Sequence, residues 1–271
     1  MFVTRFAPSP TGHLHLGHAF AAFQAFDAAE KASGTCLLRI EDIDQGRCRP
    51  EFDAAIYEDL AWLGLHWPQP VRRQSAHMDD YAGALALLID KGLVYRCFKT
   101  RAELAQGSAR APHGPSEHAP TPDVRQNQEK EGPFAWRLSV AACQRHLGPR
   151  WSDLGAEMDG VWTPLDPAQV SDPIIARKDF PASYHLASVW DDALQGVTHI
   201  IRGEDLTASA HVHLVLQAVL DLPTPIYRHH ALILDESGRR LAKRDAAKTL
   251  RALRDAGHTP RDIRAILGLP A

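Results

Sequence analysis

The residues between Ala7 and His18 offer the strongest chemistry in this sequence, because two prolines, two glycines and three histidines crowd one short segment. An apolar run that includes Phe2, Val3 and Phe6 precedes the segment, and a helical pattern follows it. Backbone N–H groups and the helix dipole favour a bound anion at the start of a helix. Imidazole rings would add donors for a phosphate. The segment therefore indicates a nucleotide site, with a metal site or a simple turn as alternatives.

A metal site is the alternative that His13, His15 and His18 suggest, since imidazole is a common metal ligand. His15 and His18, however, flank the start of the expected helix, and no Asp or Glu is placed with them locally. Helix-capping or surface histidines are the plainer interpretation. The nucleotide interpretation is favoured because of a second feature near the other end of the chain.

That second feature is a run of cations, Arg239-Arg240-Leu241-Ala242-Lys243-Arg244, which follows a strand pattern and a turn. Taken alone, such a run is usually a solvated basic face. If it lies on the same sheet as a histidine-rich helix start, a loop lysine can reach the triphosphate that the helix N-terminus holds. The presence of both segments therefore favours a nucleoside triphosphate as ligand.

The elements that would carry these residues alternate between strand and helix up to Gly92. Strands are expected at residues 2–7 and 35–40, and helices are expected at 16–33, 50–65 and 81–91. The second strand is almost all apolar, which is typical of a buried parallel strand. It ends in Glu41-Asp42-Ile43-Asp44, at the strand end where open parallel sheets bind ligands. Gly34 and Gly92 are expected to close their helices.

The middle of the chain has a different composition. Residues 108–131 are rich in Pro, Gly, Ser, Glu and Gln, so we expect a mobile segment there. Short strands are expected at 134–139 and 160–164. The α/β pattern returns from about Asp179, with a strand at 197–202, a helix at 209–220 and a strand at 227–234.

The predicted fold is α/β, a Rossmann-like parallel sheet split by a small inserted α+β domain. Residues 1–92 and 179–271 are expected to form the two halves of that catalytic domain, and residues 93–178 the insertion. Arg5 and Pro8 interrupt any signal peptide, and no stretch approaches the roughly 20 apolar residues of a membrane span, so a cytoplasmic location is expected.

Composition limits the site further. The net charge is −3, so no global basic field points to nucleic acid. Neither G-x-x-x-x-G-K-[ST] nor G-x-G-x-x-G occurs, so the nucleotide site must be of another kind. No C-x-x-C unit occurs, and free thiols are expected for the cysteines, which are Cys36, Cys48, Cys97 and Cys143.

Two segments carry a family resemblance. Pro8-Ser9-Pro10-Thr11-Gly12 running into His15-Leu16-Gly17-His18 resembles the first signature of class I aminoacyl-tRNA synthetases in its glutamyl form. Leu241-Ala242-Lys243-Arg244 resembles a degenerate version of their second signature, a mobile loop that contains lysine. Segments between the two signatures also resemble glutamyl-tRNA synthetases, namely Arg39-Ile40-Glu41-Asp42, Tyr184, Val189-Trp190-Asp191-Asp192-Ala193 and Ile200-Ile201-Arg202-Gly203-Glu204-Asp205.

The sequence continues for about thirty residues past Lys243, so it resembles the short family of glutamyl-Q tRNA(Asp) synthetases, and no anticodon-binding domain is expected. The resemblance implies that L-glutamate is activated by ATP, with Mg²⁺, to glutamyl-adenylate and placed on the queuosine base of tRNA(Asp). A monomeric enzyme is expected. The basic stretch Arg239 to Arg254 is then a candidate tRNA-facing patch, with a solvated face as an equal alternative.

The resemblance also implies roles for single residues. Arg5 and Ser9 would contact glutamate, and Glu41 would bind its ammonium group. Tyr184 and Arg202 would complete the amino-acid pocket, where a planar guanidinium suits a carboxylate.

ATP binding is implied for His15, Gly17, His18 and Lys243. Of these, His15, His18 and Lys243 are the expected catalytic residues. Glu204 and Asp205 could support the site. Ala242 stands where the family usually has serine, so one hydroxyl is lost and activity is expected to be tuned rather than removed.

A structural zinc ion is the family feature from which this sequence departs. Family members often carry a Cys-x-Cys pair in the inserted region, and here Lys99 replaces the second cysteine after Cys97. Lysine is not a thiolate ligand, and the spacing of His113, His118 and Cys143 does not restore the pattern. We therefore predict no structural zinc.

Three other functions stay open. A truncated synthetase that charges tRNA(Glu) is the nearest. A metal-dependent hydrolase built on His13, His15 and His18 belongs to another class, and a non-catalytic tRNA-binding relic is the third.

Overall fold

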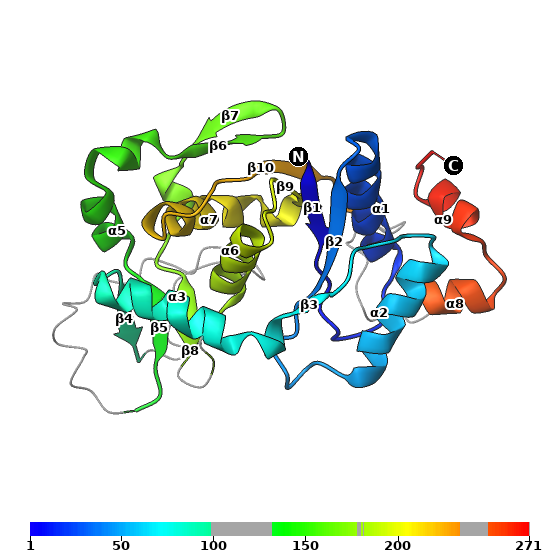
Figure 1. Cartoon of the computed structure of the whole chain (residues 1–271), viewed down its shortest axis with the longest axis horizontal. Coiled ribbons are helices and arrows are strands. Elements are labelled where there is room, and N and C mark those ends of the chain that lie inside the picture. Colours follow the sequence, from blue (N-terminus) through cyan, green and yellow to red (C-terminus); the bar gives the residue numbers. More distant parts are fainter. Residues whose placement is uncertain (99–131, 178–179, 181, 234–248, 271) are drawn as a thin grey trace. The chain divides into compact units, whose positions relative to one another are not determined.

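A computed structural model of the chain describes residues 1–98, 132–177, 180, 182–233 and 249–270. These residues divide into two compact units (Figure 1). The first unit comprises Met1–Ala76, Thr198–Glu204 and His229–Ala271, and the second comprises His77–Val197 and Asp205–Arg228. The expected domain boundaries at residues 92 and 178 stay a prediction. The segment 108–131, which we expected to be mobile, lies outside the described residues.

The first unit is built from strands of a parallel sheet and the helices that pack on them. Its elements are β1 (Val3–Phe6), α1 (Leu16–Lys31), β2 (Thr35–Ile40), α2 (Pro50–Trp62), β3 (Arg72–Arg73), the 3₁₀ helix η1 (Gln74–Ala76), β9 (His199–Gly203), α8 (Leu250–Asp255) and α9 (Pro260–Ile266). The strand at 35–40 and the helices that start at residues 16 and 50 are confirmed at the expected positions.

The sheet of the first unit runs in the order β1-β2-β3, and all of these pairings are parallel. The register sets Val3 opposite Thr35 and Ile40 opposite Arg73. β9 lies beside β1, where the Thr198 N–H donates to the Val3 carbonyl over 2.9 Å. The mixed α/β architecture with parallel strands confirms the predicted fold class.

The turn between α1 and β2 corrects one expectation. Gly34 was expected to close the helix, but α1 ends at Lys31 and Ser33 takes the left-handed conformation, with φ at +49°. A Cβ on Gly34 would overlap the carbonyl oxygen of Phe2, so glycine is required there by the close approach of β1. Gly92, with φ at +67°, does close its helix as predicted.

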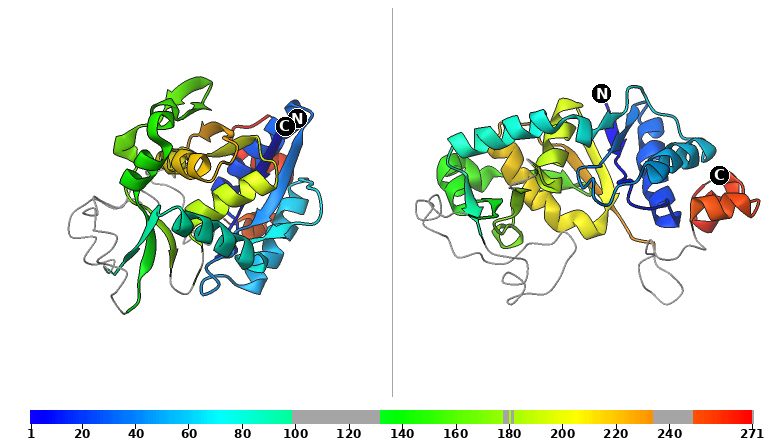
Figure 2. Two further views of the ribbon diagram at one scale, coloured as in Figure 1. Left: turned by 60° about the vertical axis from the view of Figure 1, so that its left-hand side comes forward. Right: turned by 90° about the horizontal axis from the view of Figure 1, so that it is seen from below.

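The C-terminal helices belong to the core of the first unit (Figures 1 and 2). Leu250 of α8 and Ile263 of α9 are fully buried in the same cluster as Phe23. The Arg264 guanidinium lies 4.0 Å from the centre of the Phe23 ring and donates to both carboxylate oxygens of Asp27 at 2.9 and 2.7 Å. The segment that follows the lysine-containing signature is therefore fixed to α1.

The second unit contains helices around an apolar core and small antiparallel sheets. Its elements are α3 (Met78–Asp90), β4 (Val94–Cys97), β5 (Ala135–Leu138), α5 (Val140–Leu147), η2 (Gly148–Asp153), β6 (Gly155–Met158), β7 (Val161–Pro164), η3 (Pro167–Gln169), β8 (Ile174–Arg177), α6 (Tyr184–Leu194) and α7 (Thr207–Val219). A further 3₁₀ helix, η4 (Glu204–Leu206), and β10 (Ile226–His230) pass from one unit to the other.

One sheet of the second unit has the antiparallel order β4-β5-β8, and β6 and β7 form a hairpin. The strands expected at 134–139 and 160–164 are therefore confirmed as β5 and β7. The strand expected at 227–234 is shorter, because β10 ends at His230. α3, α6 and α7 pack together around residues such as Leu88, Leu186 and Val215. No helix of the described residues is both long and apolar enough to cross a membrane.

Candidate functional site

The start of α1 is capped by two of the histidines. His15 is the N-cap, and its Nδ1 accepts a hydrogen bond of 3.1 Å from the Gly17 N–H. The His18 Nδ1 accepts one of 3.2 Å from the His15 N–H, so the rings form a reciprocal cap with their centroids 3.8 Å apart. A Cβ on Gly17 would lie 3.1 Å from the His15 ring, so glycine makes room for this arrangement.

The cap has a chemical consequence for both rings. A neutral imidazole whose Nδ1 accepts a bond carries its proton on Nε2. His15 and His18 therefore have the tautomer that can donate to a phosphate oxygen from Nε2 while Nδ1 orders the helix start. Helix capping, which the sequence offered as the plainer alternative to nucleotide binding, is compatible with nucleotide binding in this geometry.

The acidic strand end after β2 is tied to the loop after β1. The Glu41 N–H donates to the Pro8 carbonyl over 3.0 Å, and the Arg49 N–H donates to the Pro10 carbonyl over 3.1 Å. The carboxylate of Glu41 lies 3.4 Å from the guanidinium of the fully buried Arg39. The predicted ammonium-binding residue is therefore held beside Ser9, which is exposed.

The predicted glutamate-binding arginines are both buried in the first unit, Arg5 on β1 and Arg202 on β9. Ser9, His15, Gly17, His18 and Glu41 also belong to that unit. Tyr184 begins α6 in the second unit, where its ring centre lies 5.6 Å from that of His213. The structure thus gathers seven of the predicted residues in one unit and carries Tyr184 on the other.

Lys243 lies outside the described residues, but both flanks of its segment are fixed on the first unit. On one side, the Leu232 N–H donates to the Glu204 carboxylate over 3.3 Å. On the other side, the Leu250 N–H donates to the Leu14 carbonyl over 2.9 Å, and Thr249 forms an isolated β-bridge with His15. The segment that contains Lys243 therefore returns to the chain beside the histidine-capped helix start.

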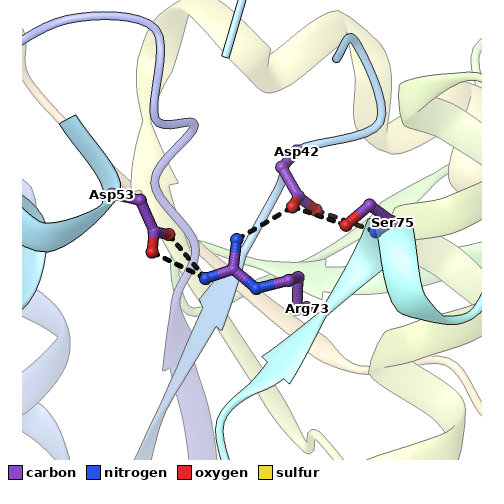
Figure 3. A network of polar contacts seen from close by, with 4 residues as sticks. All are labelled: Asp42, Asp53, Arg73 and Ser75. Atoms are coloured by element: carbon purple, nitrogen blue, oxygen red, sulfur yellow. Dashed lines mark hydrogen bonds and ion pairs between the residues drawn. The ribbon is translucent and has the colours of Figure 1, made fainter. Parts of the chain in front are cut away.

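A network of charged groups at the same strand ends was missed from the sequence (Figure 3). Arg73 of β3 donates to Asp53 of α2 and to Asp42, which follows β2, and Asp42 also accepts from Ser75. The hydrogen bonds to Asp53 and then to Asp42 raise the pKa of Arg73. The sequence signal was weak because β3 has two residues, which is too short to show a pattern.

Metal ligands are the last part of the site to examine. Among the described residues, no group of three or more His, Cys, Asp or Glu side chains could hold a metal ion. All four cysteines are free thiols, as expected. Burial raises the pKa of both Cys36 and Cys143 to about 12, so these thiols are poor nucleophiles. His113, His118 and Lys99 lie outside the described residues.

Magnesium fits this site in one way. Mg²⁺ is usually bound through substrate phosphates and one or two carboxylates, and it keeps several waters. No acidic cluster of three is found among the described residues. A magnesium ion bound with a triphosphate would supply neutralisation of phosphate charge.

A parallel sheet whose first strand leads into a capped helix start is the arrangement of a Rossmann-like nucleotide-binding protein. Residues 1–269 match the family described as tRNA synthetases class I (E and Q), catalytic domain. The chain belongs to that family.

Individual relatives and a solved structure are similar to this chain over most of its length. A glutamyl-Q tRNA(Asp) synthetase of Rhodobacter capsulatus is 43% identical, over 98% of this chain and 100% of that protein. A glutamyl-Q tRNA(Asp) synthetase of Nitratidesulfovibrio vulgaris is 40% identical, over 98% of this chain and 85% of that protein. The crystal structure of a glutamate-tRNA synthetase from Elizabethkingia anophelis matches with a TM-score of 0.70 and 27% identity, covering 91% of this chain and 53% of that one. This chain therefore spans about half the length of that solved synthetase.

Proposed function

We propose that this chain is a ligase that activates L-glutamate with ATP and transfers the glutamyl group to the queuosine base of tRNA(Asp). The observation that carries the proposal is the match to the glutamyl-Q tRNA(Asp) synthetase of Rhodobacter capsulatus, which extends over all of that protein. The charged strand ends of the first unit add support, because they offer buried cations and a half-buried carboxylate to a zwitterionic substrate.

The first step is formation of the adenylate. A carboxylate oxygen of glutamate attacks the α-phosphorus of ATP in line, and the bond from that phosphorus to the oxygen shared with the β-phosphate breaks. The products are glutamyl-adenylate and pyrophosphate. Such a transfer depends on positioning and charge stabilisation more than on covalent help from the protein.

Five residues are proposed to recognise glutamate. Arg5 and Arg202 are the partners for carboxylates, because a guanidinium can donate two parallel bonds to one carboxylate. Glu41 binds the ammonium group, and Ser9 contributes its hydroxyl. Tyr184 is proposed to contact glutamate as well. An arginine that pairs with the side-chain carboxylate would reject glutamine, which lacks the charge.

The triphosphate is assigned to the start of α1 and the lysine segment. His15 and His18 donate from Nε2, and the N–H of Gly17 lies in the first turn, where the helix dipole favours an anion. Lys243 is proposed to reach the same phosphates, since its segment is anchored at Thr249 beside His15. Mg²⁺ would accompany ATP, and we propose a cytoplasmic, monomeric enzyme.

The test of this function is transfer of labelled glutamate to purified tRNA(Asp) that contains queuosine. The same tRNA without queuosine and a tRNA(Glu) serve as matched acceptors. Label confined to the modified tRNA(Asp), and mapped to its anticodon, is the expected result. Label at the 3′ end of tRNA(Glu) would replace the proposal with a minimal charging enzyme, and label on none of the three would contradict both.

A further inference from the structure

Arg73 joins Asp42, the neighbour of Glu41 in the sequence, to Asp53 of α2 (Figure 3). Its guanidinium donates to both oxygens of Asp53 at 2.7 Å and to Asp42 at 3.0 Å. Asp42 lies two residues after the end of β2, and Asp53 lies in the first turn of α2. The bonds therefore span the loop that connects β2 to α2 and fix both of its ends.

The network converges on a buried carboxylate. Asp42 is 5% exposed and accepts from Arg73, from the Ser75 N–H at 2.8 Å and from the Ser75 hydroxyl at 2.6 Å. A buried carboxylate needs this number of donors, because an unpaired charge away from water is strongly unfavourable. Loss of Arg73 would leave Asp42 with two bonds from one neutral residue, and the strand end would have to move toward water.

Glu41 stands immediately before Asp42, so whatever fixes the backbone of one fixes the other. On its other side, Glu41 is held through its N–H to the Pro8 carbonyl and through its carboxylate to Arg39. The bonds of Asp42 to Arg73 and Ser75 add a further anchor for the backbone at Glu41.

We propose that Arg73 is a positioning residue for glutamate activation: it clamps Asp42 and Asp53, and this clamp holds Glu41 where it can bind the substrate ammonium group. The proposal rests on the proposed function. It assigns Arg73 no contact with the substrate. The two guanidinium nitrogens are the important feature, because Nη2 donates to Asp53 and Nη1 donates to Asp42. A lysine would supply its charge as a point from a single nitrogen.

The experiment compares Arg73→Met with the matched control Arg47→Met. Arg47 also pairs with an aspartate, Asp44, at 2.7 Å, and it lies in the same loop, but its side chain is 74% exposed. An exposed pair of this kind contributes little. Arg73→Lys and Asp53→Asn are added as milder variants, so that a folded protein is available even if Arg73→Met fails to fold.

Two measurements are made on each variant. Hydrogen exchange followed by mass spectrometry reports on the peptides that cover residues 41–53, with no substrate present. Glutamate-dependent ATP–pyrophosphate exchange without tRNA gives the KM for glutamate and for ATP, together with kcat. A change in folding alone would alter the melting temperature and the fraction of active protein, but not the KM for glutamate.

We expect faster hydrogen exchange in residues 41–53 for Arg73→Met, with a KM for glutamate raised about tenfold or more and a smaller change for ATP. Arg73→Lys and Asp53→Asn should lie between that variant and the wild type, and Arg47→Met should match the wild type. A KM for glutamate within twofold of wild type in every folded clamp variant would overturn the proposal, as would an unchanged hydrogen exchange. If wild type itself shows no glutamate-dependent exchange, the proposed function fails, and the hydrogen-exchange result still decides whether the clamp exists.

Discussion

The two units supply different donors to four of their carboxylates, of which Asp42 and Asp191 are buried. In the first unit Asp42 and Asp53 accept from the guanidinium of Arg73. In the second unit Asp191 accepts from the Tyr81 hydroxyl at 2.9 and 3.1 Å, and Asp172 accepts from the Tyr95 hydroxyl and the Val140 N–H, each at 2.9 Å. The first unit thus places full charges at its strand ends, where a charged substrate is proposed to bind.

This difference in donors predicts which measured property each substitution should change. Charged clamps at strand ends position groups that must meet other charges, so their loss should be measured in substrate binding. Neutral donors to Asp172 and Asp191 satisfy a scaffold, so their loss should be measured in the free energy of unfolding. The following predictions separate these two outcomes.

The largest effect is expected for Arg5→Met in the first unit. Removal of a buried guanidinium that pairs with a substrate carboxylate should lower kcat/KM for glutamate on the order of 100-fold. The measurement is ATP–pyrophosphate exchange at varied glutamate. Arg228→Met is the control, because Arg228 pairs with Glu157 at a site where both side chains are 40% exposed. Equal kcat/KM values for glutamate in the two variants would show that Arg5 does not bind glutamate.

Asp59 tests the first unit away from the strand ends. Asp59 is fully buried on α2, and its carboxylate lies 3.6 Å from the guanidinium of Arg254. Burial is the largest influence and raises the pKa of Asp59 from 3.8 to about 6. Among the nearby charges, Arg254 and Arg251 lower this pKa, whereas Glu58 and Asp255 raise it. The fold therefore favours the protonated form. Asp59 contributes most to stability below about pH 4, and this contribution is lost as the pH rises through about 6.

The corresponding measurement is the free energy of unfolding of wild type and Asp59→Asn across this pH range. The stability of the variant relative to wild type should rise by about 3 kcal/mol or less between pH 4 and pH 7. A difference that stays constant with pH would show that folding does not raise the pKa of Asp59.

Asp172→Asn is the matching substitution in the second unit. The amide keeps the shape but turns one acceptor into a donor that faces the Tyr95 hydroxyl or the Val140 N–H, so unfolding should become easier by about 1–3 kcal/mol. Burial, and then the Asp172 charge, raise the pKa of Tyr95, and the variant should relieve the second cause. Urea unfolding gives the stability, and the KM for glutamate should stay at the wild-type value. A raised KM for glutamate would contradict the prediction that this carboxylate affects stability and not substrate binding.

The smallest effect is expected for metal removal. If no structural zinc is present, a chelator should leave the melting temperature of the second unit unchanged, and metal analysis should find no stoichiometric zinc. The second unit contains Cys97 and Cys143, both buried. Stoichiometric zinc whose removal lowers the melting temperature would contradict the prediction and would point to ligands outside the described residues.

The sequence predicted the elements with strong local patterns. The apolar run of residues 35–40 corresponds to β2 at both ends, and α2 begins at Pro50 as expected, because a proline suits the first helical turn. The helix ends at Trp62, short of the expected residue 65. Gly34 was misjudged because its requirement comes from Phe2, which precedes β1 and is distant in the sequence. Such contacts between distant segments leave no local signal.

The same limit applies to the site. His15, His18 and Glu41 could be chosen from type and position, since each follows a strand or starts a helix. Arg73 could not, because its partners are 20 and 31 residues away and its strand is too short to show periodicity. Helix capping by His15 and His18 was one of the sequence alternatives, but the reciprocal form of the cap could not be predicted, because it depends on ring orientation.

The central claim is that the charged strand ends of the first unit activate glutamate. Glutamate-dependent exchange of labelled pyrophosphate into ATP, with no tRNA present, tests it most directly in wild type and in Glu41→Gln. We predict exchange in the wild type that requires glutamate and is not supported by glutamine, and a raised KM for glutamate in the variant. Wild type without exchange, or a Glu41→Gln variant that matches wild type, would contradict the account.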